Sequence, residues 1–234
     1  MALTSNWHKV QQRFGQCGGQ AMPKISGFWC EIDHIEKSGP PLVLLHGSGQ
    51  DETCWDDSVV TIAPVSPIVR VRGNIVWEGK YAFFRRRPDR SLDMPDLTRS
   101  ATEISFLIEA VTQQFGGRRP ILLGYSNGAI VAAAAIRDHA PTIEGAVLLR
   151  GLSPDPDTPF PQTITCPVLI LSGETDSRRH PQDGTRLAAQ LTAAGADTAY
   201  HLLPCGHGWD PEGQDGMIIK DWLAKLGIAG RSAA

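Results

Sequence analysis

Residues 121–130 carry the pattern best suited to covalent chemistry. An apolar run typical of a buried strand leads into Gly-Tyr-Ser-Asn-Gly at 124–128, and an alanine-rich helical run over 129–137 follows. Gly-x-Ser-x-Gly between a strand and a helix is typical of a nucleophile elbow, a sharp turn that lifts a serine hydroxyl above the strand end. Side chains in place of Gly124 and Gly128 would collide across so tight a turn. An ordinary glycine-flanked turn is the alternative, and the strand–turn–helix context favours the catalytic interpretation of Ser126.

His207 is the predicted base for this serine. A serine hydroxyl is a weak nucleophile at neutral pH, so it needs a base within hydrogen-bond reach and an acid that fixes the tautomer of that base. On a strand–turn–helix scaffold the expected chain order is serine, then aspartate or glutamate, then histidine. His207 follows the last predicted strand, 198–203, and of the seven histidines it alone combines this order with the correct edge of the sheet.

The acid has several candidates along the chain. Asp155 and Asp157 follow the strand predicted at 145–149, and Glu174 and Asp176 follow the strand predicted at 166–171. We favour Asp176, because Gly-x-x-Asp directly after the strand is where this acid usually emerges. The alternative role for Asp176 is a cap on the helix that starts near residue 181.

A second glycine-rich loop is expected to stabilise negative charge during acyl transfer. The continuous apolar run at 41–45 predicts a strand buried on both faces, and it leads into His-Gly-Ser-Gly at 46–49. Acyl transfer needs two backbone N–H groups aimed at the developing oxyanion. We assign them to Asn127, directly after the nucleophile, and to Ser48 in this loop. A phosphate-binding loop is the alternative, but both of its sequence patterns, Gly-x-x-x-x-Gly-Lys-[Ser/Thr] and Gly-x-Gly-x-x-Gly, are absent here. His46 is interpreted as a structural residue of this loop rather than a catalytic base.

The long connection at 72–94 is rich in aromatic and arginine residues. It starts at the carboxyl edge of the predicted sheet, where open α/β sheets place their sites. Trp77, Phe83 and Phe84 therefore either form a wall of the substrate pocket or simply pack, and Trp209 lies two residues after His207. If the four aromatic residues converge beside the serine, the pocket suits short acyl chains. The arginines at 85–87 are mostly interpreted as a solvated loop, with Asp89 and Asp93 close behind them.

Alternating strands and helices predict the α/β fold class, a mostly parallel doubly wound sheet flanked by helices. A polar extension is expected over 1–24, and a single domain over 25–230 with no large lid. The predicted strands span 28–36, 41–45, 67–71, 121–123, 145–149, 166–171 and 198–203, and the predicted helices span 55–63, 93–115, 129–137, 181–194 and 212–226.

Composition narrows the classes of function. The 234 residues carry 22 basic and 25 acidic side chains, and this near balance predicts no nucleic-acid partner. The five cysteines are scattered without a Cys-x-x-Cys pair, which predicts no zinc site and favours a reducing compartment. No run of about 18 apolar residues and no leader pattern is present, so we expect a cytoplasmic protein without a membrane partner.

These motifs together resemble α/β-hydrolases of the carboxylesterase/phospholipase group, which includes acyl-protein thioesterases. The resemblance covers about residues 41–226. It implies Ser126, Asp176 and His207 as a catalytic triad, with Ser48 and Asn127 as oxyanion donors. It also implies hydrolysis of a small-molecule ester without metal or cofactor, and frequent homodimers. The matching segments are residues 44–49, Phe-Phe-Arg-Arg at 83–86 with Asp93, Asp96 and Leu97, residues 124–129, Gly-Glu-Thr-Asp at 173–176, and Gly-His at 206–207.

Departures from the group and alternatives to it remain open. Ser-Arg-Arg at 177–179 stands where relatives usually carry an apolar pair, and Arg150-Gly151 replaces small residues. A dienelactone-type hydrolase would use cysteine at the elbow, and Ser126 argues against it. A non-catalytic binding protein would typically lack the serine or the histidine. The prediction is a short-chain carboxylesterase that forms an acyl-enzyme on Ser126, and an acyl-thioesterase or lysophospholipase on the same triad is the alternative.

Overall fold

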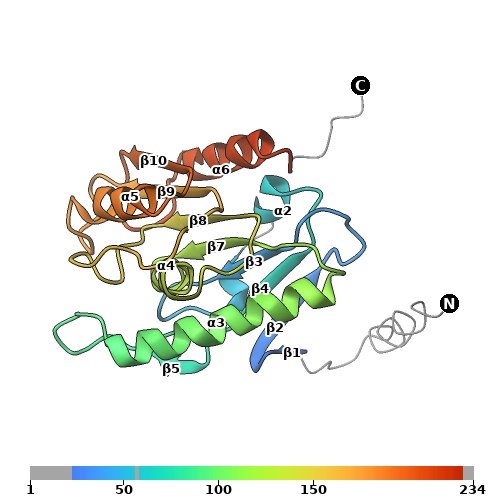
Figure 1. The fold of residues 1–234 in the computed structure, drawn as a ribbon, viewed down its shortest axis with the longest axis horizontal. Helices are drawn as coiled ribbons and strands as arrows, with labels where there is room; N and C mark the ends of the chain where they lie inside the picture. The colour runs from blue at the N-terminus through green and yellow to red at the C-terminus, as the bar shows by residue number, and fades with distance from the viewer. Residues whose placement is uncertain (1–22, 56–57, 229–234) are drawn as a thin grey trace.

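The computed structural model in Figure 1 describes residues 23–55 and 58–228. Most of the predicted 1–24 extension lies outside these residues. In the described part, no helix is both long and apolar enough to cross a membrane. The strands are β1 (Lys24–Ile25), β2 (Phe28–Asp33), β3 (Leu42–Leu45), β4 (Ile68–Val71), β5 (Ile75–Trp77), β6 (Lys80–Ala82), β7 (Ile121–Tyr125), β8 (Gly145–Leu149), β9 (Val168–Gly173) and β10 (Thr198–Leu203), and the helices are η1 (Glu52–Cys54), α2 (Ser58–Ile62), α3 (Met94–Gln114), α4 (Asn127–His139), α5 (Asp183–Ala193) and α6 (Gln214–Lys225).

The main sheet has the strand order β1-β2-β4-β3-β7-β8-β9-β10, and the strands from β4 to β10 in this order are parallel. Only β1 and β2 at one edge pair antiparallel. Every residue of β3, β4 and β8 is buried, as expected for strands covered on both faces. The predicted fold class is therefore confirmed.

Helices cover both faces of the sheet, as Figure 1 shows with α3 and α4 on one side and α2 and α6 on the other. Side chains of α3, α4 and α5 share one buried apolar cluster, and those of α2 and α6 share a second cluster across the sheet. Because parallel strands end at the same edge, the loops after β3, β7, β9 and β10 lie together. The register aligns Leu45 with Gly124, and Gly173 with Leu203.

The connection at 72–94 differs from the expected loop. It contains the hairpin β5–β6, whose tight turn has positive φ angles at Glu78 (49°) and Gly79 (80°). Such a turn is typical of two-residue hairpins. Gly79 was the feature of the sequence that could have indicated the hairpin. Phe83 and Phe84 follow the hairpin and are fully buried in the cluster that contains α3 and α4. Of the two roles considered from the sequence, pocket wall or packing, these two side chains therefore have the packing role.

Among the glycines in the described residues, Gly128 at the start of α4 has the closest neighbour to an added Cβ. A Cβ added to it would lie 2.0 Å from the Leu45 carbonyl oxygen, and one added to Gly124 would lie 2.7 Å from the main chain of Ala129. The expected collision across the turn is thus confirmed. The two glycines let α4 begin directly against β3 and β7.

We expect Gly128→Ala to destabilise the protein, because the Leu45 carbonyl belongs to a buried strand and cannot move aside easily. Overpacking here should cost at least about 2 kcal/mol and lower the midpoint of thermal unfolding. Gly216→Ala is the matched control. Gly216 lies within α6, its Cβ would meet Ile62 only at 3.7 Å, and alanine favours helix. Equal midpoints for the two variants would contradict this account of the turn.

Candidate active site

The turn at Ser126 is sharp and strained. Ser126 has φ 52° and ψ −104°, a combination that a residue with a side chain rarely adopts. Its N–H donates to the Leu149 carbonyl at 2.9 Å, and the Gly128 N–H donates to the His46 carbonyl at 3.0 Å. Bonds to the last residue of β8 and to the first residue after β3 therefore hold the turn. Strain of this kind costs on the order of 1–3 kcal/mol and persists only where the surroundings fix it.

Ser126, His207 and Asp176 form one hydrogen-bonded row. Ser126 Oγ lies 2.9 Å from His207 Nε2, and His207 Nδ1 lies 2.8 Å from Asp176 Oδ2. The other oxygen of Asp176 accepts the Arg178 N–H at 2.9 Å. The Asp176 side chain is 2% exposed and that of His207 is 12% exposed. A serine, a histidine and an aspartate in this order can transfer the serine proton to the ring and stabilise the resulting cation.

Burial sets the protonation of His207. Loss of solvent lowers the pKa of His207 below its ordinary value, and the hydrogen bond to Asp176 opposes this shift. The nearby cations Arg179 and Arg178 lower it further. The ring is therefore mostly neutral at pH 7, as a base must be.

The other acids considered from the sequence lie in different surroundings. Asp155 forms an ion pair with Arg137 at 3.4 Å. Asp157 and Glu174 are exposed, and in the described residues neither is bonded to His207. Of the candidates, only Asp176 reaches the histidine.

The loop after β3 and the first residue of α4 each have a backbone N–H group that can serve as a donor beside the serine turn. No acceptor is present among the described residues for the N–H groups of Ser48 and Asn127. His46 is fully buried, its Nδ1 bonds the Gly47 carbonyl at 2.7 Å, and its Nε2 accepts the Gly73 N–H at 3.0 Å. Burial lowers the pKa of His46 to about 4, so this ring is a neutral structural residue, as the sequence indicated.

The four aromatic residues that were predicted to line the pocket lie in different environments. The Phe83 ring packs 4.8 Å from the His46 ring, and the Phe84 side chain lies in the core. Trp77 is half-buried on β5, and Trp209 is exposed with its ring edge-on to Trp55. The peptide groups at 83–84 do reach the site, because the Asn127 side chain bonds the Phe83 N–H and the Phe84 carbonyl.

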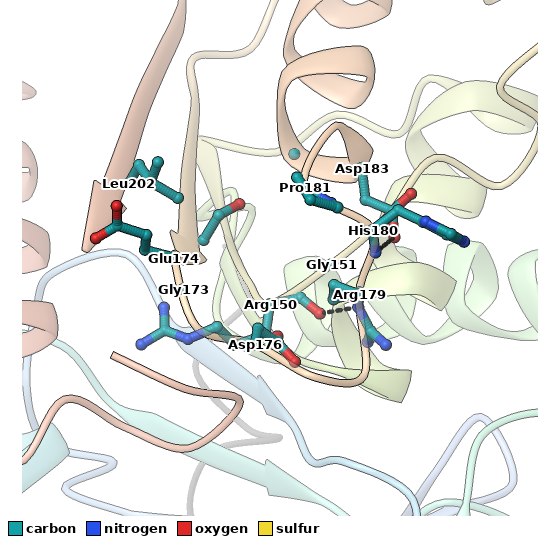
Figure 2. Close-up of a pocket in the computed structure, with 12 residues that line it drawn as sticks. Arg150, Gly151, Gly173, Glu174, Asp176, Arg179, His180, Pro181, Asp183 and Leu202 are labelled. Atoms are coloured by element: carbon teal, nitrogen blue, oxygen red, sulfur yellow. Dashed lines mark hydrogen bonds between the residues drawn. The ribbon is translucent and has the colours of Figure 1, made fainter. Parts of the chain in front are cut away.

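A cavity of about 280 Å³ adjoins the acid, and Figure 2 shows the side chains around it. None of the four aromatic residues lines it, and Leu202 is its only large apolar side chain. Charged and polar side chains share the rest of the lining with glycines and Pro181, so no aromatic wall faces this cavity. The lining residues are Arg150, Gly151, Ser172, Gly173, Glu174, Asp176, Arg179, His180, Pro181, Asp183, Gly184 and Leu202.

Arg150 stabilises the loop that carries His207 and was missed as a site residue. Its guanidinium is fully buried and pairs with the equally buried Asp215 at 2.6 Å. It also donates to the carbonyls of Gly206 at 3.2 Å and Gly208 at 3.1 Å, the two residues that flank His207. Losing one partner of such a buried pair is costly, so the pair fixes the loop. Arg150 stands where relatives carry a small residue, and this difference in the sequence could have indicated its role.

Arg179 contacts the Ser126 hydroxyl itself and was also missed as a site residue. Its Nη2 lies 3.2 Å from Ser126 Oγ, and its Nε donates to the Arg150 carbonyl at 2.7 Å, the bond drawn in Figure 2. Burial and the neighbouring cation Arg86 lower the pKa of Arg179 to about 10. The guanidinium still carries its charge at pH 7.

Within the described ranges, no group of three or more His, Cys, Asp or Glu side chains is arranged to hold a metal ion.

Comparison with known proteins agrees with the fold and with hydrolase chemistry. The model of the dienelactone hydrolase family matches residues 97–221. MhqD of Bacillus subtilis (strain 168), which is described as a hydrolase, is 30% identical over 181 residues, covering 75% of this chain and 90% of MhqD. Serine at the elbow therefore does not exclude this family, contrary to the argument from Ser126.

Two similar solved structures are carboxylesterases. The Bacillus cereus carboxylesterase superposes with a TM-score of 0.78 at 25% identity, over 85% of this chain and 94% of that one. The carboxylesterase from Mesorhizobium loti gives a TM-score of 0.78 at 25% identity, over 88% of this chain and 98% of that one. With the family match and the strand order described above, these likenesses lead to one conclusion: the chain belongs to the dienelactone hydrolase family and is a hydrolase with an α/β-hydrolase fold.

Proposed function

We propose that the protein hydrolyses carboxylic esters of small molecules through an acyl-enzyme on Ser126. The observation that carries this proposal is the row of two hydrogen bonds, 2.9 and 2.8 Å long, from Ser126 through His207 to Asp176. The similarity to two carboxylesterases supports the same class of substrate.

Acylation begins when His207 Nε2 accepts the proton of Ser126 Oγ while the oxygen attacks the ester carbonyl carbon. The carbonyl oxygen becomes an oxyanion and accepts hydrogen bonds from the N–H groups of Ser48 and Asn127. Neither N–H group has an acceptor in the described part of the protein. His207 then gives the proton to the departing alcohol oxygen. The carbon–oxygen bond breaks, and the acyl group stays on Ser126.

Deacylation repeats these steps with water. His207 removes a proton from water, the hydroxide attacks the acyl carbon, and the proton returns to Ser126 Oγ as the carboxylic acid leaves. Asp176 stabilises the protonated ring in both halves, because its buried carboxylate bonds Nδ1. The same residues would cleave a thioester, and no observation favours that substrate over an oxygen ester.

Ser126→Ala should reduce ester hydrolysis by about four to six orders of magnitude and leave the fold intact. The measurements are turnover of a nitrophenyl ester, labelling by a fluorophosphonate probe, and circular dichroism. Ser105→Ala is the control, a change of the same size on α3 outside the row. A Ser126→Ala variant that keeps a tenth of the wild-type rate would rule out this nucleophile.

Asp176→Asn should lose about 10⁴-fold in turnover, because the amide favours the wrong tautomer of His207. Glu174→Gln and Asp155→Asn are matched controls that make the same kind of change at acids not bonded to the histidine. Both should stay near the wild-type rate. A loss confined to either control would move the acid to that position.

The pH dependence of kcat/KM should follow the protonation of His207. Protonated His207 cannot accept the serine proton, so kcat/KM should rise with pH through the pKa of His207, which burial holds below its ordinary value of 6.5, and then level off. The Asp176 bond raises this pKa. The residual activity of Asp176→Asn should therefore have its inflection at lower pH than the wild type. A rise centred above pH 7 in the wild type would point to another base.

A further inference from the structure

The backbone N–H of Ser48 lies in a loop that is not rigid by itself. Gly47 and Gly49 flank Ser48, and Gly49 has a φ of 73°. Glycine loses more conformational freedom on folding than any other residue, so a loop with two glycines must be held by contacts with other segments. Its first residue is held by α4, because the Gly128 N–H bonds the His46 carbonyl at 3.0 Å. The part of the loop beyond His46 needs further contacts.

Tyr81 supplies such contacts directly after Ser48. It forms an isolated antiparallel bridge with Gln50, in which the Gly49 N–H donates to the Tyr81 carbonyl at 2.9 Å and the Tyr81 N–H donates to the Gln50 carbonyl at 3.0 Å. The Gln50 side chain accepts the Gly47 N–H at 2.9 Å. The N–H groups on both sides of Ser48 are therefore engaged, whereas that of Ser48 has no acceptor in the described residues.

Two ion pairs attach the β5–β6 hairpin to the end of the same loop. Arg72 forms a bidentate pair with Glu52, whose side chain is 3% exposed, and its guanidinium lies 5.0 Å from the centre of the Tyr81 ring. Lys80 pairs with Asp51 at 3.1 Å. The bidentate pair fixes the geometry more firmly, because the half-exposed lysine pair is worth little. Side chains therefore reinforce the bridge between the two main chains.

The Asn127 side chain binds the same stretch of chain two residues after Tyr81. Its Oδ1 accepts the Phe83 N–H at 2.9 Å, and its Nδ2 donates to the Phe84 carbonyl at 3.1 Å. Asn127 is 2% exposed, so loss of these bonds would leave buried peptide groups unsatisfied. The first residue of α4 is thus anchored through its own side chain.

We propose that residues 81–84 hold the two N–H groups of the proposed oxyanion site at a fixed separation, with Tyr81 and the Asn127 side chain as positioning groups. This inference rests on the proposed ester hydrolysis at Ser126. One end of the 81–84 segment binds the loop that carries the Ser48 N–H, and the other end binds the residue that carries the second N–H. The segment is only about 10 Å long when extended, so it leaves the two groups little freedom to separate.

The effect of this positioning is expected on turnover rather than on substrate binding. Each donor must lie about 2.7–3.1 Å from the oxyanion, and a displacement of about 1 Å can cost on the order of 10² in rate. Full negative charge on the oxygen develops only during the reaction, so the bound ester depends less on the two donors. Release of the 81–84 segment should therefore lower kcat and leave KM near the wild-type value. The pH at which activity rises should not move, because the bonds of His207 are unchanged.

The first test compares Asn127→Ala with Ser100→Ala. Asn127→Ala keeps the backbone N–H and removes only the side-chain bonds to 83–84. Ser100→Ala is the matched control, because the buried Ser100 hydroxyl donates to the Phe83 carbonyl at 2.7 Å and bonds neither donor residue.

The two substrates are nitrophenyl acetate and its thiono analogue, in which sulfur, a weak hydrogen-bond acceptor, replaces the carbonyl oxygen. Asn127→Ala should lower kcat for the oxygen ester about 10²-fold. The ratio of kcat/KM for the oxygen ester to that for the thiono ester should fall by about tenfold or more, because sulfur gains less from the donors. Ser100→Ala should keep the wild-type ratio, even where it lowers the midpoint of thermal unfolding.

Tyr81→Pro tests the other end of the segment. Proline removes the N–H that bonds Gln50, whereas residues 80 and 82, which face β5, keep the bonds of the hairpin. Tyr81→Ala is the control that removes the ring and keeps both main-chain bonds. The oxygen-to-thiono ratio should fall in Tyr81→Pro and not in Tyr81→Ala. A wild-type ratio in a folded Asn127→Ala or Tyr81→Pro variant, or an equal fall in the matching control, would overturn the proposal.

Hydrogen exchange separates this inference from the proposed function, because it requires no turnover. Main-chain exchange over 46–51 should become faster in Asn127→Ala, although the substitution lies in α4, and should not change in Ser100→Ala. This result in a protein whose wild type hydrolyses neither ester would support the positioning role and contradict the esterase proposal. Unchanged exchange over 46–51 in Asn127→Ala, with an active wild type, would overturn the positioning role and leave ester hydrolysis at Ser126 intact.

Discussion

The left-handed backbone at Ser126 is the constraint on which the rest of the site depends. With φ at 52°, the chain turns from β7 into α4 within one residue, and the hydroxyl stands clear of the strand end. Such a backbone is costly for serine, and hydrogen bonds from the turn to Leu149 and His46 hold it in place. The close approach at Gly128 lets these bonds form, because any side chain there would meet Leu45. Packing at the sheet thus sets the geometry at Ser126.

Buried charge organises the side of the site opposite the loop after β3. The Arg150–Asp215 pair lies beneath the histidine loop, and the Asp215 carboxylate also accepts the Asp210 N–H at 2.7 Å. The Arg150 carbonyl in turn orients Arg179 toward Ser126. One fully neutralised arginine therefore positions a second arginine that lacks a carboxylate partner in the described chain. The same arginine therefore supports the His207 loop and places a positive charge next to Ser126.

The sequence predicted those features that depend on local pattern. Continuous apolar runs predicted the parallel strands, and glycines around Ser126 predicted the tight turn. Chain order and sheet edge led to Asp176 and His207, which lie beside Ser126 because parallel strands end together. The contacts of Arg150 and Arg179 could not be predicted, because spacing does not determine where a long side chain points. Phe83 and Phe84 were assigned by position after a strand, although the β5–β6 hairpin returns the chain to the core.

Covalent modification tests most directly whether Ser126 is the nucleophile. A nitrophenyl carbamate transfers a carbamoyl group that serine hydrolases release slowly, so the adduct can be located by peptide mass spectrometry. We expect a single carbamoyl group per chain, carried by Ser126, which forms in step with nitrophenol release and with loss of ester hydrolysis. Nitrophenol release without an adduct on Ser126, or a carbamoyl group on another residue that accounts for the lost activity, would contradict it.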